Sequence, residues 1–241
     1  VIYWEPSLPR MRAMVGAETV IDSRRVHLLH ETGLLPVHYF PRDDVRFDLL
    51  EATEHRTHCP FKGDASYWSI RAGDVVVENA VWGYPRPIEG APPLADHVAV
   101  YFDHFDAWYE EDEPVYARPR DPYHRVDVRS GSYEVVVRHR GQVIAESRRP
   151  KLLFETGLPV RWYLPPADVR TDLLRASDTV SECPYKGDGQ HWHLADGGGD
   201  EVEDAAWSLP HPLPEALAAA RHLCFYSDKV DVEVDGRRVE A

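Results

Sequence analysis

The sequence is poor in cysteine: its 241 residues include only Cys59, Cys183 and Cys224. No two of them form a CxxC pair, so neither a disulfide scaffold nor a four-thiolate zinc site is expected. Sparse, unpaired cysteines are typical of a reducing compartment. We therefore expect a cytoplasmic protein that needs no metal and no other cofactor.

Long apolar runs and an excess of basic residues are also missing. The longest apolar stretches, such as residues 97–102, are far too short to span a bilayer, and the first residues lack the basic start and apolar core of a signal peptide. Lysine and arginine total 27 against 41 aspartate and glutamate residues, a net charge of −14. A general nucleic-acid binder needs a basic face. We expect neither a nucleic-acid nor a membrane partner.

The sequence contains one pattern twice. Trp68 returns as Trp192, and one inserted residue near 197–199 brings Trp82 into register with Trp207. Chance cannot keep one register across so many rare residues, so we infer an internal duplication. The segments that recur closely, all at one spacing, are 31–34 with 155–158, 44–50 with 168–174, and 59–64 with 183–188.

The duplication predicts the domain organisation. We place a first repeat domain at 1–115 and a second at 123–241. Residues 116–122 are expected to form a short linker, because prolines cluster there and the charge changes sign from the acidic run that precedes it.

Each repeat is expected to be mainly β, with short strands and few helices. Prolines recur about every dozen residues, which leaves little room for long helices. Alternating or apolar runs predict a hairpin at 134–145 and strands near 98–102, 223–226 and 230–235. The glycine run at 197–199 predicts a loop. Short helices are expected at 43–50, at 167–174 with Asp168 as its N-terminal cap, and at 214–221.

A set of short motifs recurs in the same order in both repeats. They are Glu-Thr-Gly, Tyr-x-Pro, Asp-Val-Arg, Cys-Pro-aromatic-Lys-Gly and Trp-x-x-Pro, at 31–33, 39–41, 44–46, 59–63 and 82–85, and again at 155–157, 163–165, 168–170, 183–187 and 207–210. The combination resembles the bacterial family called domain of unknown function 427, in a tandem two-domain form.

The resemblance implies a fold but no activity. It implies two β-tent-like domains, similar in outline to Mss4-like proteins and to the ligand-binding domain of cereblon. We also expect a pseudo-twofold axis between the two domains, because duplication can fuse a homodimer into one chain. Those relatives often hold a structural zinc ion through paired CxxC motifs. This sequence has one cysteine at each such place, so the resemblance implies a β-tent without that metal.

Comparison of the two repeats selects the candidate site residues, because incidental residues need not recur. His27, His30, His38, His55 and His58 have no histidine counterparts, which favours incidental or surface histidines over a metal cluster. Aromatic rings with a few fixed polar groups are typical of a small-molecule pocket. The recurring candidates are Glu31, Tyr39, Cys59, Lys62, Trp68 and Trp82 in the first repeat, and Glu155, Tyr163, Cys183, Lys186, Trp192 and Trp207 in the second.

Three functions fit these residues. We favour a module that binds an unidentified small molecule in one aromatic-lined pocket per domain, although some tryptophans must serve the core. The first alternative is a thiol-dependent enzyme using Cys59 or Cys183, since a lysine nearby lowers a thiol pKa and Glu31 could accept a proton. The second is an interaction scaffold in which duplication has fused a dimer into one chain, as a monomer or as a homodimer. The sequence leaves open whether the chain is an enzyme.

Overall fold

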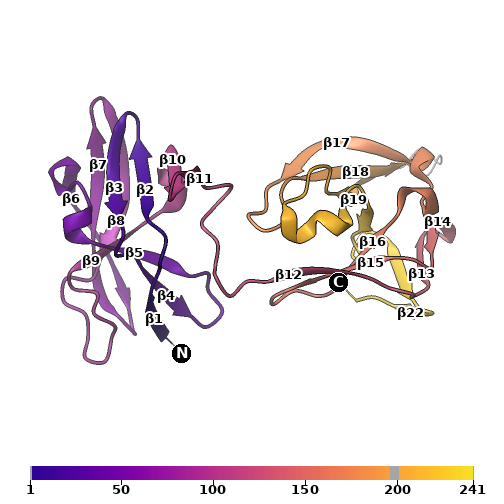
Figure 1. Cartoon of the computed structure of the whole chain (residues 1–241), viewed down its shortest axis with the longest axis horizontal. Helices are drawn as coiled ribbons and strands as arrows, with labels where there is room; N and C mark the ends of the chain where they lie inside the picture. The colour runs from indigo at the N-terminus through magenta and orange to yellow at the C-terminus, as the bar shows by residue number, and fades with distance from the viewer. Residues whose placement is uncertain (1, 196–200, 241) are drawn as a thin grey trace. The chain divides into compact units, whose positions relative to one another are not determined.

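The computed structural model describes residues 2–195 and 201–240, and the glycine run 197–199 lies outside them. The chain divides into two units, Val1–Asp121 and Pro122–Ala241, here called domain 1 and domain 2. Within the described residues each domain contains one seven-stranded and one four-stranded sheet (Figure 1), so the predicted mainly β fold is confirmed. No helix in the described part of the chain is long and apolar enough to cross a membrane.

Domain 1 is built from two antiparallel sheets. The strand order is β1-β4-β5-β9-β8-β7-β6 in the larger sheet and β11-β10-β2-β3 in the smaller. The strands are β1 (Ile2–Pro6), β2 (Met11–Val15), β3 (Glu18–Ser23), β4 (His27–Glu31), β5 (Val37–Pro41), β6 (Leu50–Cys59), β7 (Gly63–Ala72), β8 (Val75–Gly83), β9 (His97–Val100), β10 (Ala107–Glu110) and β11 (Glu113–Pro114).

Domain 2 repeats this topology strand for strand. Its sheets have the orders β12-β15-β16-β20-β19-β18-β17 and β14-β13-β21-β22, so that β12 takes the place of β1 and β22 that of β11. The strands are β12 (Val126–Ser130), β13 (Val135–His139), β14 (Gln142–Ser147), β15 (Lys151–Glu155), β16 (Arg161–Leu164), β17 (Leu174–Ser181), β18 (Gly189–Ala195), β19 (Glu201–Ser208), β20 (Leu223–Phe225), β21 (Asp231–Val234) and β22 (Arg237–Arg238).

The predicted hairpin is present as β13 and β14. Arg140 and Gly141 connect the strands with φ angles of 48° and 82°. Two successive residues in the left-handed region give the turn whose twist matches that of the flanking strands. The same device follows β21, where Asp235 and Gly236 have φ angles of 47° and 73°.

The predicted short helices are 3-10 turns instead. Val45 and Val169 interrupt the segments near 43–50 and 167–174, because each returns to an extended conformation and bridges to the smaller sheet, at Ile21 and Ala145. The turns are η1 (Arg42–Asp44), η2 (Phe47–Leu49), η3 (Phe102–His104), η4 (Pro166–Asp168), η5 (Thr171–Leu173) and η6 (Pro214–Ala219).

The prediction that Asp168 caps a helix is wrong. Asp168 is the last residue of η4, and its carboxylate accepts hydrogen bonds from Ser147 Oγ at 2.7 Å and from the Arg149 guanidinium at 2.7 and 3.0 Å. Asp44 makes the equivalent bonds to Ser23 and Arg25 in domain 1. Both carboxylates therefore tie a turn to the smaller sheet.

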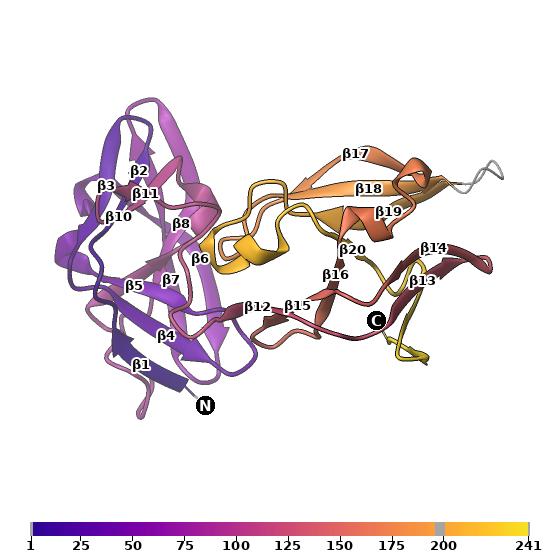
Figure 2. The same cartoon turned by 45° about the vertical axis from the view of Figure 1, so that its right-hand side comes forward.

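The larger sheet of each domain carries an apolar cluster on both faces. Its inner face packs against the smaller sheet, as Phe40 and Ile70 do against Met11 and Ile21 in domain 1. Figure 2 shows the same layering in domain 2, with β17–β19 on one side of the interior and β13 and β14 on the other. A second cluster, which includes Tyr39, lies on the outer face. Successive strand residues point to opposite faces, so Tyr39 and its neighbour Phe40 serve different clusters.

Candidate functional site

Five of the six candidates in domain 1 gather on the outer face of the larger sheet, and their domain 2 counterparts lie at the matching positions of the repeat. In domain 1, Glu31 ends β4, Tyr39 lies in β5, Cys59 ends β6, Lys62 follows in the β6–β7 loop, and Trp82 lies in β8. Tyr39, Cys59 and Trp82 belong to one apolar cluster. We call this group, with its domain 2 counterparts Glu155, Tyr163, Cys183, Lys186 and Trp207, the outer-face site.

An ion pair lies at the margin of each outer-face site. In domain 1 the Lys62 ammonium donates to Glu31 Oε2 at 2.5 Å, and the two side chains are only 9% and 14% exposed. Lys62 also lies over the Tyr84 ring, 5.7 Å from its centroid. In domain 2, Lys186 pairs with Glu155 in the same way. Both charges of each pair have thus been largely removed from water.

Buried tyrosines form the floor of the site. Burial raises the pKa of Tyr39 and of Tyr84, and the Glu31 carboxylate raises both further. Tyr163 behaves like Tyr39, and its hydroxyl accepts a hydrogen bond from the Trp207 indole at 2.9 Å. These phenols stay neutral at physiological pH, so each hydroxyl keeps a proton that it can donate.

A pair of rings in tilted contact extends each site toward solvent. Trp82 lies 4.5 Å from Tyr101, and Trp207 lies 4.3 Å from Tyr226, measured between ring centroids, with interplanar angles of 40° and 42°. Tyr101 is exposed, so this ring pair reaches from the buried phenols to the protein surface. Tyr101 and Tyr226 occupy matching positions of the two repeats, so comparison of the repeats could have identified both tyrosines, but they were not among the candidates.

Trp68 and Trp192 do not belong to the outer-face site. Trp68 pairs across strands with Val81, whereas its neighbour Tyr67 pairs with Trp82, so Trp68 points to the inner face. It packs edge-on against Phe47 and contributes to the inner core. Trp192 packs against the inner core of domain 2. The prediction that one pocket in each domain contains both of its candidate tryptophans is therefore wrong.

A cavity in domain 2 also lies away from these tryptophans. Its volume is about 20 Å³, and its lining includes Trp162, Leu164 and Val232 from the two facing sheets. It is no larger than a water molecule requires. None of the five residues of the domain 2 outer-face site lines this cavity, although Arg161 and Cys224 do.

The comparison of the repeats did not select two residues near the domain 2 site. His124 Nε2 lies 3.1 Å from Glu155 Oε1, and the His124 ring stacks on Tyr185 at 4.0 Å. The matching position of the first repeat would precede Val1. Arg161, at the start of β16, lies over the Trp207 ring at 5.6 Å, and its counterpart in domain 1 is Val37.

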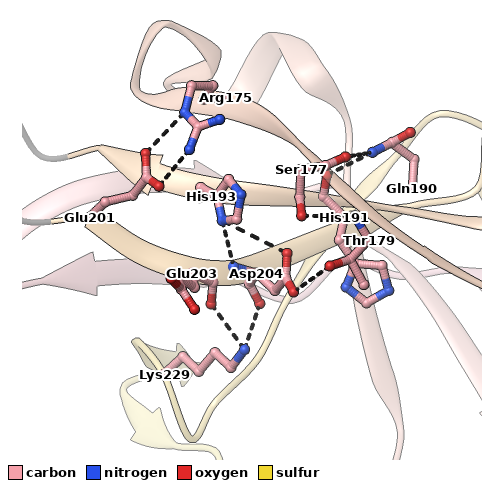
Figure 3. Close-up of polar contacts among 10 residues, drawn as sticks. All are labelled: Arg175, Ser177, Thr179, Gln190, His191, His193, Glu201, Glu203, Asp204 and Lys229. Atoms are coloured by element: carbon pink, nitrogen blue, oxygen red, sulfur yellow. Dashed lines mark hydrogen bonds and ion pairs between the residues drawn. The ribbon is translucent and has the colours of Figure 1, made fainter.

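A polar network beside the outer-face site fixes a bulge in domain 2 (Figure 3). Asp204 has a φ angle of 47°, donates its backbone N–H to His193 Nδ1 at 3.0 Å, and accepts a hydrogen bond from Thr179 at 2.9 Å. His191, the cross-strand neighbour of Trp207, contacts Ser181 Oγ at 3.1 Å. Lys229 closes the network by donating to the carbonyl of Asp204.

The same bulge exists in domain 1 with other side chains. Asn79 has a φ angle of 50°, its N–H donates to Ser69 Oγ at 3.0 Å, and its amide oxygen accepts from Thr53 at 2.6 Å. Asparagine and aspartate tolerate the left-handed conformation better than other non-glycine residues. Because the bulge persists while its side chains change, we interpret this network as structural.

The histidines of the first repeat are dispersed. His30 contacts Glu5 at 2.9 Å, His58 contacts Asp64 at 2.7 Å, and His27 stacks on Trp4. Across residues 2–195 and 201–240, no group of three or more histidine, cysteine, aspartate or glutamate side chains is arranged to hold a metal ion.

Comparison with known proteins gives a family and no activity. A family model described as a domain of unknown function (DUF427) matches residues 3–111 and, a second time, residues 127–236. The two matches coincide with the two copies of the strand topology. No curated protein sequence matches the chain.

Proposed function

The chain belongs to the DUF427 family as a tandem two-domain member, and because that description assigns no activity, we propose from the geometry that it binds small molecules at one outer-face site per domain. The observation that carries this proposal is the ion pair at the margin of each site. Removing two charges from water costs more than their attraction commonly returns, so a buried pair is weak evidence for stability. Its presence beside the same rings in both domains supports a role in orienting a ligand.

The remaining groups of the site fit a small cyclic ligand with polar substituents. The Trp82–Tyr101 pair offers a ring surface that reaches solvent. Neutral phenols can donate hydrogen bonds, and Glu31 can accept them. Aromatic area supplies affinity and a few fixed polar atoms supply orientation, which is the composition of small-molecule sites.

A metabolite screen on the full chain tests the proposal. Binding is measured as an increase in melting temperature. For each hit, it is then measured as shifts of the Trp82 and Trp207 indole N–H signals in NMR spectra. Tyr101→Ala and Tyr226→Ala should each abolish the shifts in their own domain. Tyr133→Ala is the matched control, since Tyr133 is as exposed as Tyr101 but packs on Trp162. The proposal would be contradicted if the hits shift neither indole signal, or if the shifts they cause persist in both Tyr101→Ala and Tyr226→Ala.

A thiol-dependent enzyme is the second candidate, because Cys59 and Cys183 are partly exposed and Cys59 lies in the outer-face cluster. The Cys59→Ser/Cys183→Ser double variant separates the two functions. A thiol enzyme converts the ligand in the wild-type chain and loses this turnover in the variant, whereas a binding module shows no turnover in either and still binds the ligand in the variant.

A further inference from the structure

The outer-face sites of the two domains differ in charge. In domain 1 the site contains one cation, Lys62, and one anion, Glu31, which form an ion pair. Val37, two residues before Tyr39 in β5, packs against the apolar cluster of the domain 1 outer face. In domain 2, Lys186 and Glu155 cancel in the same way, but Arg161 stands where domain 1 has Val37. The domain 2 site therefore carries one additional positive charge.

Arg161 faces the outer-face site. Its cross-strand partner in β15 is Leu153, and both Leu153 and the next-but-one residue Tyr163 belong to the outer-face cluster. The guanidinium lies 5.6 Å from the centroid of the Trp207 ring. It is close enough to lower the pKa of the Tyr163 hydroxyl and of the Cys224 thiol, although burial raises both pKa values overall.

Among the described residues, no carboxylate forms an ion pair with the Arg161 guanidinium. This is unusual in a chain with a net charge of −14, in which arginines such as Arg149, Arg170 and Arg175 each bond to an aspartate or a glutamate. Glu155, the anion of the same site, is held by Lys186 and by His124. Asp204 and Asp228 act electrostatically on Tyr226, as Arg161 does, but the ion pairs and hydrogen bonds of the described residues include none between either of them and Arg161. A half-buried, uncompensated guanidinium on an aromatic ring remains.

We propose that Arg161 is the anion-binding group of the domain 2 site, and that this site takes a small molecule bearing an oxyanion, a carboxylate or a phosphate, whereas the domain 1 site takes a neutral ligand. The proposal rests on the proposed function, because it specifies the ligand of that same site. The planar fork of an arginine matches the two oxygens of a carboxylate or phosphate, and stacking on an indole holds that fork in place.

The test uses a reciprocal exchange between the domains in the full chain. Inorganic phosphate and acetate are titrated separately against the Trp82 and Trp207 indole N–H signals, with sodium chloride holding the ionic strength constant. Arg161→Val installs the domain 1 residue, and Val37→Arg installs the domain 2 residue. Arg237→Val, in the exposed strand β22, removes the same charge at another place on domain 2. Arg161→Lys keeps the charge but not the planar fork.

We expect saturable shifts of the Trp207 signal in the wild-type chain and not of the Trp82 signal. Arg161→Val should weaken binding by about 10- to 100-fold, the loss typical of a charge-assisted hydrogen-bond pair. Arg237→Val should leave binding unchanged, and Val37→Arg should create a response at Trp82. A stronger response to phosphate or to acetate identifies which oxyanion the site prefers. Should Arg161→Val fail to fold, Arg161→Gln and the Val37→Arg response decide the question.

Each contrary result is informative. If neither anion moves the Trp207 signal, or if Arg161→Val binds as the wild type does, Arg161 only covers the indole and the inference is wrong. Metabolites that bind both domains equally and ignore Arg161→Val would leave the proposed function standing and overturn this inference alone. Anion binding that needs Arg161, in a chain for which no metabolite moves the Trp82 signal, would support this inference and overturn the proposed function for the domain 1 site.

Discussion

Replacement of Glu31 by glutamine tests whether the Lys62–Glu31 pair behaves as a buried one. Glutamine keeps the shape of the side chain and one acceptor oxygen, but it leaves the Lys62 ammonium, whose side chain is 9% exposed, without a counter-charge. Removing one partner of a buried pair costs about 3–5 kcal/mol, and an exposed pair is worth at most about 1 kcal/mol. Because some solvent reaches this pair, we expect the free energy of unfolding of domain 1 to fall by about 2–4 kcal/mol.

The control is the same substitution in an exposed pair. Glu51 and Arg71 bond through two contacts of 2.8 Å, and their side chains are 58% and 53% exposed. Glu51→Gln should therefore cost less than about 1 kcal/mol. The double variant Glu31→Gln/Lys62→Met should recover most of the loss, because an apolar side chain needs no counter-charge.

Differential scanning calorimetry of the full chain measures the effect. For a domain of this size, 1 kcal/mol corresponds to about 3–4 °C, so Glu31→Gln should lower the melting temperature of domain 1 by about 10 °C. Glu155→Gln should act on the domain 2 transition. The reasoning fails if Glu31→Gln lowers the transition no more than Glu51→Gln does, or if adding Lys62→Met makes the loss larger.

Three further predictions concern other parts of the chain. Burial, with a smaller contribution from His30, lowers the pKa of His38 to about 4. The unfolded chain, in which His38 has its ordinary pKa of about 6.5, therefore binds a proton more readily than the folded chain does, so the stability present above about pH 6.5 should be lost as the pH falls toward 4. The urea midpoint of His38→Gln should fall less than that of the wild type over the same pH range. Asn79→Ala should lower the free energy of unfolding in urea by about 1–2 kcal/mol, because alanine is strained at positive φ and cannot accept the hydrogen bond from Thr53. Asn79→Asp introduces the residue that domain 2 has at this position and should leave the free energy of unfolding nearly unchanged. Burial raises the pKa of Cys224 to about 12, so an aromatic disulfide reagent should titrate two thiols in the native protein and three in urea, and a rapidly reacting third thiol in native protein would contradict the structure.

The sequence predicted the features that depend on local rules or on recurrence. The turn at Arg140–Gly141 was predictable because Gly141 lies between two apolar runs and a glycine readily adopts a positive φ angle. The duplicated β fold and the family follow from motifs that recur in one register. The 3-10 turns could not be predicted, because Val45 and Val169 are drawn into extended conformations by bridges to another sheet.

The candidate site was predicted only in part, for a reason inherent in comparing repeats. Recurrence selects residues needed for the fold together with residues needed for a site, so Trp68 was included although it packs the inner core. It also discards whatever one copy has changed, which removed Arg161 and hid His124. The small-molecule ligand, the cytoplasmic location and the absence of a nucleic-acid or membrane partner stay predictions.

Among the described residues, each strand pairing and each core cluster is formed by residues of one half of the chain. A substitution inside the core of one copy therefore leaves the core packing of the other copy untouched. In evolutionary terms, the core of one half does not limit the mutations that the core of the other half can accept. After the duplication one copy could keep an ancestral ligand while the other acquired a new residue such as Arg161, and the protein could gain a second specificity without losing the first.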